Sequence, residues 1–154
     1  QVRGITFGGS GCPQGSNLSI PGLKSTYFDD AFEAKFGGDE RVTDQRKNCQ
    51  MNIAISYPLG WQFNPPSTTT LGYGDLVAGV NGLVRSTYYF SGSSDQTTTD
   101  LELTGPVAGY FSKTESSPVD LWSPCGSEGM LNINLQARIT GGRTNETSRI
   151  RVDT

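Results

Sequence analysis

Two segments of the chain alternate between apolar and polar side chains. In residues 49–57 the odd positions are apolar or aromatic, and most even positions are polar. In residues 131–139 five aliphatic side chains alternate with asparagine, glutamine and arginine. A period of two places all side chains of one kind on one face of a β-strand. Each segment therefore predicts a strand that buries one face, and that face requires a second sheet to pack against.

Glycine and proline separate the remaining short β-prone segments. The chain has 20 glycines and 8 prolines, which is typical of many strands joined by tight turns. Two dipeptides, Asn81-Gly82 and Gly141-Gly142, predict two-residue hairpin turns. The second turn would pair the apolar positions of residues 131–139 with those of the segment that follows.

The length of 154 residues predicts a single domain over residues 1–154. No long segment has the 3.6-residue period of an amphipathic helix. We therefore predict an all-β fold, a two-sheet antiparallel β-sandwich, with a jelly roll as one form of it.

The charge and hydropathy of the chain exclude some classes of partner. A formal net charge of −3 and a pI near 4.8 argue against a nucleic-acid partner, which would require a basic surface. No run of eighteen apolar residues exists, so the sequence predicts no membrane span. The sequence starts at Gln1 without a charged and then apolar leader, and we interpret it as the mature form of a secreted protein.

The chain contains no histidine. This excludes histidine-based catalytic triads and the commonest metal ligand, so we expect no cofactor and no metal. A glycosidase needs two carboxylates across a sugar, and strand-borne candidates exist, but such side chains usually point to water. We therefore expect a protein that is not an enzyme. The strand-borne carboxylates that we considered for a glycosidase site are Asp75, Asp100, Glu102, Glu115 and Asp120.

Three cysteines and two sequons bear on secretion. Cys12, Cys49 and Cys125 permit three different single bridges and always leave one thiol unpaired. Asn17 and Asn145 each begin an Asn-X-Ser/Thr sequon without proline, which predicts N-glycosylation sites in a secretory route.

Aromatic residues on or near predicted strands are candidates for a binding surface. Trp61, Tyr73 and Tyr110 would form a platform for a glycan or a peptide if they were exposed. The alternative is that they pack in the core or as cross-strand pairs. Residues 29–47 are rich in both acidic and basic side chains, but they lack the oxygen spacing of a calcium loop. We expect a solvated loop there, with one helical turn or an edge strand over residues 31–36.

Four ordered motifs resemble a family of small secreted, mostly fungal proteins classed as a domain of unknown function. They are GSGCP at residues 9–13, KNCQ at 47–50, STYYF at 86–90, and WSPCG at 122–126, which is followed by LNIN. The resemblance implies secretion, a compact β-rich fold and disulfides, and it supplies no activity or catalytic residues.

The resemblance also bears on the cysteines. Members usually carry a further cysteine about where Thr97 lies in this chain. If that cysteine pairs with the one at the position of Cys125, this chain lacks the second bridge. The resemblance thus implies a Cys12–Cys49 disulfide and a free thiol at Cys125.

These observations predict a secreted, non-catalytic binding protein. The partner we expect is an extracellular protein of a host, with a secreted protease as the most concrete example, so that the protein would act as a fungal effector and inhibitor. A rigid, bridged scaffold that presents loops favours this hypothesis. The alternative is a carbohydrate-binding module for a cell-wall polysaccharide that uses the aromatic residues.

Overall fold

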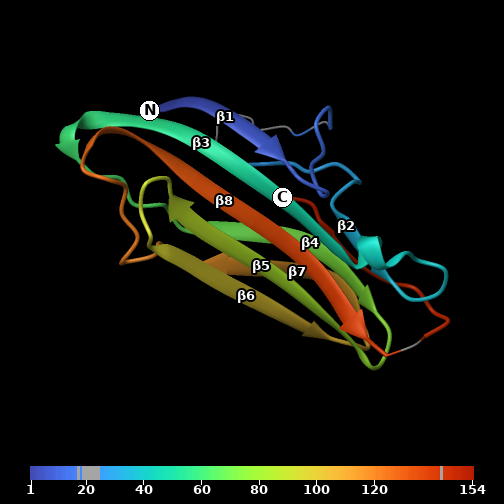
Figure 1. Cartoon of the computed structure of the whole chain (residues 1–154). Helices are drawn as coiled ribbons and strands as arrows, with labels where there is room; N and C mark the ends of the chain where they lie inside the picture. The colour runs from blue at the N-terminus through green and yellow to red at the C-terminus, as the bar shows by residue number, and fades with distance from the viewer. Residues whose placement is uncertain (17, 19–24, 143) are drawn as a thin grey trace.

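The computed structural model describes residues 1–16, 18, 25–142 and 144–154. Their strands form two antiparallel sheets that pack as a β-sandwich, as the sequence predicted (Figure 1). The larger sheet consists, in spatial order, of β1 (Val2–Gly8), β3 (Arg46–Trp61), β8 (Gly126–Gly141), β5 (Val80–Phe90) and β6 (Gln96–Thr104). The smaller sheet consists of β2 (Glu33–Phe36), β9 (Ser148–Val152), β4 (Thr68–Leu76) and β7 (Val107–Glu115). A short 3₁₀ turn, η2 (Val42–Gln45), precedes β3.

The strands from β2 to β9 follow the order of a jelly roll. Successive strands alternate between the two sheets except at the β5–β6 hairpin, and β2, the first of the eight, pairs with β9, the last. The strand β1 is an addition, because it pairs with β3 at the edge of the larger sheet. The charged segment after residue 29 forms the edge strand β2, as expected.

Both predicted hairpin turns are wrong. Asn81 and Gly82 lie inside β5, and the chain turns just before them, where the Val80 amide donates to the Val77 carbonyl at 3.2 Å. Gly79, with a φ of 81°, supplies the left-handed conformation that this turn requires. The strands β4 and β5 therefore belong to different sheets and do not form a hairpin.

The second predicted hairpin fails in the same way. The strands β8 and β9 lie in different sheets, and β9 pairs with β2 and β4. The apolar positions of β8 and β9 do face one another, but across the core rather than along a ladder of hydrogen bonds. An apolar pattern does not distinguish stacking from pairing, because both arrangements bury the same face.

The two alternating segments form the centre of the larger sheet. The strands β3 and β8 pair in a register that places Met51 beside Ile133 and Cys49 beside Leu135. Met51, Cys49 and Leu135 are buried, and Ile133 packs against the same core. The opposite side of this core comes from the smaller sheet, which contributes Ala34, Phe36, Leu76, Ile150 and Val152.

A disulfide joins Cys12 to Cys49, with a sulfur–sulfur distance of 1.98 Å. This is the bridge that the family resemblance implied. Both cysteines are buried, and the backbone amide of Gly11 donates to the Asn48 carbonyl at 2.8 Å beside them. The disulfide therefore ties the glycine-rich segment after β1 to the middle of the larger sheet.

Candidate binding surface

The outer surface of the larger sheet carries a block of amide side chains. Because apolar side chains of β3 and β8 face the core at every second position, the positions between them face outward. The register of the two strands pairs these outward residues directly: Asn48 with Gln136, Gln50 with Asn134, and Asn52 with Asn132. We call the surface formed by these six residues the amide face.

Neighbouring strands extend the rows of the amide face. On one side Thr6 of β1 lies beside Asn52, and on the other side Tyr89 of β5 lies beside Asn132. In the next row Thr87 lies beside Asn134. The face therefore combines amides, hydroxyls and one aromatic ring across four adjacent strands.

Hydrogen bonds between strands hold these side chains in place. The amide nitrogen of Asn134 donates to the side-chain oxygen of Gln50 at 2.9 Å, and Gln50 donates to the Tyr89 hydroxyl at 3.4 Å. Asn132 is buried, and its side-chain nitrogen donates to the Ser91 hydroxyl at 2.9 Å. Much of the side-chain entropy that binding would otherwise cost is thus already lost in the free protein.

Charge enters at one end of the amide face, where Arg85 lies beside Gln136. The Arg85 guanidinium donates two hydrogen bonds to Asp100, at 2.7 and 2.9 Å. These hydrogen bonds lower the pKa of Asp100 and raise the pKa of Arg85. Arg85 and Asp100 offset each other, but Arg46 and Arg138 pair in the next row and add positive charge at this end, where Arg46 donates to the Gln136 side-chain oxygen at 3.1 Å. The six amides are themselves uncharged, so the surface away from this end suits a neutral ligand with many hydroxyl groups.

A second surface lies on the outer side of the smaller sheet. Tyr73 of β4 and Tyr110 of β7 lie directly opposite each other, with ring centres 5.2 Å apart in an edge-to-face arrangement. The Arg151 guanidinium carbon lies 5.7 Å from the centre of the Tyr73 ring. Tyr110 is 81% exposed, and we call this surface the tyrosine face.

Trp61, the third aromatic candidate, does not join the two tyrosines. It lies at the end of β3, opposite Gly126, and therefore in the other sheet. Sequence reasoning grouped the three because each lies on or near a predicted strand, but it did not assign the strands to sheets. The structure thus brings together Tyr73 and Tyr110 and leaves Trp61 apart.

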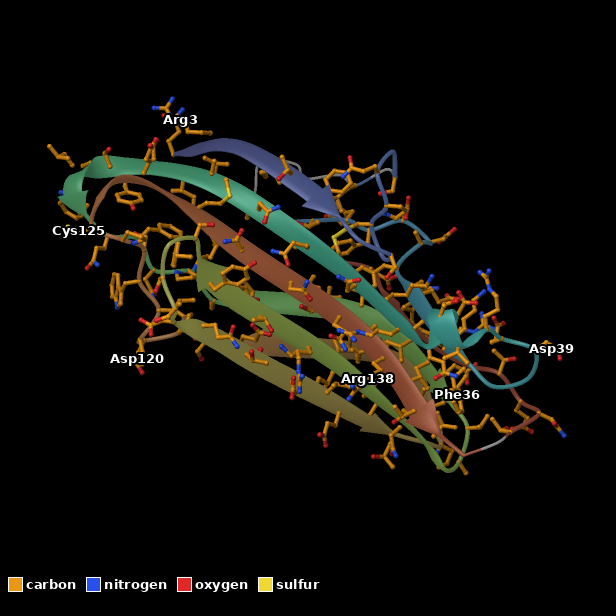
Figure 2. All side chains as sticks on the ribbon, viewed as in Figure 1. Arg3, Phe36, Asp39, Asp120, Cys125 and Arg138 are labelled. Atoms are coloured by element: carbon orange, nitrogen blue, oxygen red, sulfur yellow. A yellow bond between two sulfur atoms is a disulfide. The ribbon has the colours of Figure 1, made fainter. Side chains whose placement is uncertain are left out.

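Trp61 belongs to an apolar end of the sandwich. Residues 59–63 and 118–125 lie side by side there: the Ser123 amide donates to the Phe63 carbonyl, and the Phe63 amide donates to the Ser123 hydroxyl. Figure 2 marks this end by Asp120 and Cys125, at the opposite end of the molecule from Asp39. The apolar end, as we define it, consists of four exposed side chains: Leu59, Trp61, Val119 and Trp122.

The remaining predicted sites are the free thiol and the two glycosylation sequons. Cys125 is exposed and forms no disulfide, and its thiol donates to the Gly60 carbonyl oxygen at 3.6 Å. Asn145 is exposed on the connection between β8 and β9, where a glycan would meet solvent. Asn17 lies outside the described residues.

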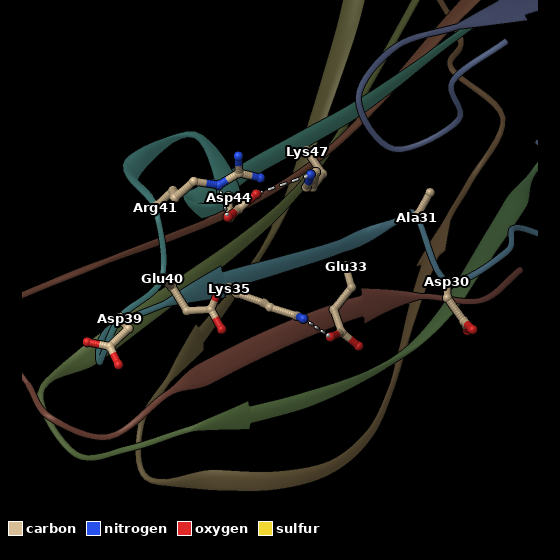
Figure 3. A pocket seen from close by; sticks show the side chains of 9 residues that line it. All are labelled: Asp30, Ala31, Glu33, Lys35, Asp39, Glu40, Arg41, Asp44 and Lys47. Atoms are coloured by element: carbon tan, nitrogen blue, oxygen red, sulfur yellow. Dashed lines mark hydrogen bonds and ion pairs between the residues drawn. The ribbon is translucent and has the colours of Figure 1, made fainter.

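A charged cleft of about 550 Å³ lies beside β2 (Figure 3). Its charges are largely paired with one another: Asp44 contacts Arg41 at 3.2 Å and Lys47 at 3.6 Å, and Glu33 contacts Lys35 at 3.7 Å. The hydrogen bond from Arg41 lowers the pKa of Asp44. Within the residues that the structure describes, no group of carboxylates and cysteines is arranged to hold a metal ion.

Two of the five candidate carboxylates are tied to cations. Asp100 pairs with Arg85 on the outer surface, and Glu115 pairs with Lys113 between the sheets. A carboxylate held by a cation is poorly placed to transfer a proton to a substrate.

Comparisons with known proteins place the chain in a family. The family model described as a domain of unknown function (DUF4360) matches residues 1–154. An uncharacterized secreted protein of Arthroderma benhamiae is 41% identical over 144 residues, which cover 90% of this chain and 59% of that protein. This chain thus spans less than two thirds of that relative's length, and the secreted location predicted from the sequence agrees with it. Within the described part of the chain, no helix is long and apolar enough to cross a membrane.

Two solved structures have weak likeness to this fold. A structure of TmCBM61 in complex with beta-1,4-galactotriose has a TM-score of 0.39 and 10% identity, covering 97% of this chain and 83% of that one. The enzymatically active domain of tailspike protein 4 from bacteriophage CBA120 has a TM-score of 0.22 and 13% identity, covering 98% and 18%. At these TM-scores neither likeness bears on function. By the family match and the secreted relative, the chain belongs to the DUF4360 family.

Proposed function

We propose that this secreted protein is a non-catalytic carbohydrate-binding protein whose amide face contacts a neutral polysaccharide. The observation that carries the proposal is the block of six paired amides on β3 and β8. Asn132 and Gln136 are buried, whereas the other four amides are half-buried and keep part of their surface open to a ligand. An amide carries donors and an acceptor in a fixed plane, and a sugar hydroxyl also donates and accepts, so the two sets of groups match. A carboxylate or an ammonium group would offer only one of these roles.

The shape and stiffness of the surface favour an extended ligand. The amide face spans neighbouring strands of an open sheet, whereas sites for small molecules are usually enclosed cavities. Tyr89 adds an aromatic ring at the edge of the amides, against which the apolar side of a sugar ring can pack. Interlocked side chains reduce the entropy lost on binding.

The experiment is affinity electrophoresis in gels that contain soluble neutral glucan, galactan or mannan, or acidic polygalacturonate. We expect at least one neutral polysaccharide to retard the protein, and Gln50→Ala combined with Asn134→Ala to abolish the retardation. Tyr110→Ala is the matched control, because it removes an exposed aromatic ring from the opposite surface and should migrate like the unmodified protein. Retardation that is lost in Tyr110→Ala but kept in the amide variant would overturn the assignment, as would no retardation in any neutral gel.

A protein partner is the second candidate function, and the apolar end favours it. Leu59 is 84% exposed, Val119 is 80% exposed and Trp61 is 65% exposed. Exposed apolar side chains that include tryptophan are typical of protein interfaces. If this end binds a secreted host protease, the unmodified protein inhibits that protease, and a variant with Leu59→Ser and Trp61→Ser does not. Recovery of the same host proteins by both forms would argue against the apolar end as the contact.

A further inference from the structure

An apolar cleft of about 520 Å³ lies between the two sheets. One of its walls is the inner face of β3 and β8, with Met51, Ile53, Leu131 and Ile133. Phe63 lies on another side. Its volume falls within the range of roughly 300–1,000 Å³ that is common for small-molecule sites.

The cleft exists because the two sheets differ in strand length. The strands β3 and β8 have 16 residues each, whereas β2 and β9 have 4 and 5. At about 3.3 Å per residue, the short strands cover only part of the inner face of the long ones. Ile53 and Ile133 are consequently only partly buried, although both point toward the interior.

The cleft has hydroxyl groups in its lining. The Tyr88 hydroxyl and the Thr68 hydroxyl lie 2.8 Å apart, and both residues line the cleft. Thr68 also lies 3.3 Å from a carboxylate oxygen of Glu115, which is paired with Lys113 farther inside. Burial raises the pKa of Tyr88, so its hydroxyl stays neutral at physiological pH. The cleft thus combines apolar walls with uncharged hydrogen-bonding groups.

We propose that this cleft binds an uncharged, single-tailed lipid, such as a long-chain alcohol. The aliphatic tail packs against Met51, Ile53 and Ile133, and the hydroxyl head hydrogen-bonds to Tyr88 and Thr68. A fatty acid fits less well at neutral pH, because the described residues that line the cleft include no lysine or arginine to pair with its carboxylate. Lys113 already holds Glu115, the carboxylate to which Thr68 donates. This site lies between the sheets and is separate from the amide face.

The probe for this proposal is hexadecanol, which displaces an uncharged environment-sensitive dye from the intact protein. We expect saturable one-to-one binding at neutral pH, with palmitate at least about fivefold weaker than hexadecanol. Tyr88→Phe removes one hydrogen bond without changing the shape of the cleft, and it should weaken hexadecanol binding about fivefold. Tyr110→Phe is the matched control: this tyrosine is exposed on the outer side of the smaller sheet, so its loss of a hydroxyl should leave hexadecanol binding unchanged.

A second variant tests the volume of the cleft. Ile53→Phe places a larger side chain at a partly buried position on its wall, and it should reduce binding by at least about tenfold. Thermal unfolding shows whether Ile53→Phe folds. If it does not fold, the binding measured for Tyr88→Phe alone decides the test. The proposal is overturned if hexadecanol shows no saturable binding, if Tyr88→Phe and Tyr110→Phe bind alike, or if palmitate binds as tightly as hexadecanol.

Discussion

Lys113 and Glu115, two residues apart on β7, form an ion pair that is buried between the two sheets. The Lys113 ammonium also donates to the Thr99 hydroxyl at 2.7 Å and to the Ser86 hydroxyl at 3.2 Å. These hydroxyl groups come from the opposite sheet, so the polar cluster connects the two layers of the sandwich. A buried pair of this kind is tolerated because each charge has partners.

The first prediction concerns the pH dependence of stability. Burial lowers the pKa of Lys113 from its ordinary value of 10.5 to about 8, and the nearby Asp100 carboxylate opposes this shift. Between these two values the unfolded chain binds a proton that the folded chain does not, so Lys113 makes the free energy of unfolding rise with pH. Below pH 8 its contribution is constant.

Chemical denaturation at pH 8 and pH 10.5 measures this effect as the difference between the unmodified protein and Lys113→Met. We expect the unmodified protein to gain more stability, or to lose less, than the variant over this interval. Lys35→Met is the control, because the Lys35 side chain is 42% exposed and the variant should keep the pH response of the unmodified protein. Equal pH responses of the unmodified protein and Lys113→Met would contradict the assignment.

The second prediction separates the two charges of this pair. Lys113→Met leaves the Glu115 carboxylate buried without its cation, and we expect a loss of roughly 3–5 kcal/mol in the free energy of unfolding. Adding Glu115→Leu removes the unpaired buried carboxylate and should recover a large part of the lost free energy of unfolding. Urea denaturation of the unmodified protein, both single variants and the double variant gives the coupling energy. A double variant whose loss equals the sum of the two single losses would show that the side chains do not interact.

The third prediction concerns the disulfide. The Cys12–Cys49 bridge closes a loop with a sequence separation of 37 residues. Chain-entropy arguments for a loop of this length give about 4 kcal/mol, so Cys49→Ser should destabilise the protein by about that amount. Cys125→Ser, which changes an exposed free thiol, should alter the free energy of unfolding by no more than about 0.5 kcal/mol. Comparable losses in the two variants would indicate that Cys125 also has a structural role.

The fourth prediction uses two glycines on neighbouring strands. A methyl group at Gly72 would meet the Arg151 carbonyl oxygen and the Phe111 ring, whereas a methyl group at Gly109 would meet open space. Gly72→Ala should therefore lower the free energy of unfolding by about 1–3 kcal/mol. Gly109→Ala should leave it unchanged or raise it by up to about 1 kcal/mol. Thermal unfolding decides, and a stable Gly72→Ala variant would argue against this close approach of β4 to its neighbours.

The alternating pattern was enough to predict the sandwich but not its connections. Met51 and Leu135 are buried at the centre of the larger sheet because a period of two allows only one face to enter the core. The turn dipeptides Asn81-Gly82 and Gly141-Gly142 led to two wrong hairpins. In both cases the apolar residues on either side of the connection share a core across the sheets, and local turn preferences did not reveal this.

The candidate site was visible in the sequence but went unrecognised there. The aromatic residues drew attention, yet only Tyr73 and Tyr110 lie together. The stronger signal was the identity of the polar residues in the two alternating segments, which are mostly amides rather than charges. Their significance depends on the β3–β8 register that pairs Gln50 with Asn134, and long-range strand pairing cannot be read from one sequence.

The most direct test of the account is a titration followed by the side-chain NH₂ signals of asparagine and glutamine in ¹⁵N-labelled protein. An oligosaccharide derived from the neutral polysaccharide that retards the protein is added in steps. The account predicts shifts of the Gln50, Asn52, Asn132 and Asn134 signals with a common dissociation constant, while the Asn145 signal on the distant β8–β9 connection stays in place. Shifts confined to residues of the tyrosine face or the apolar end, with the amide-face signals unmoved, would contradict it.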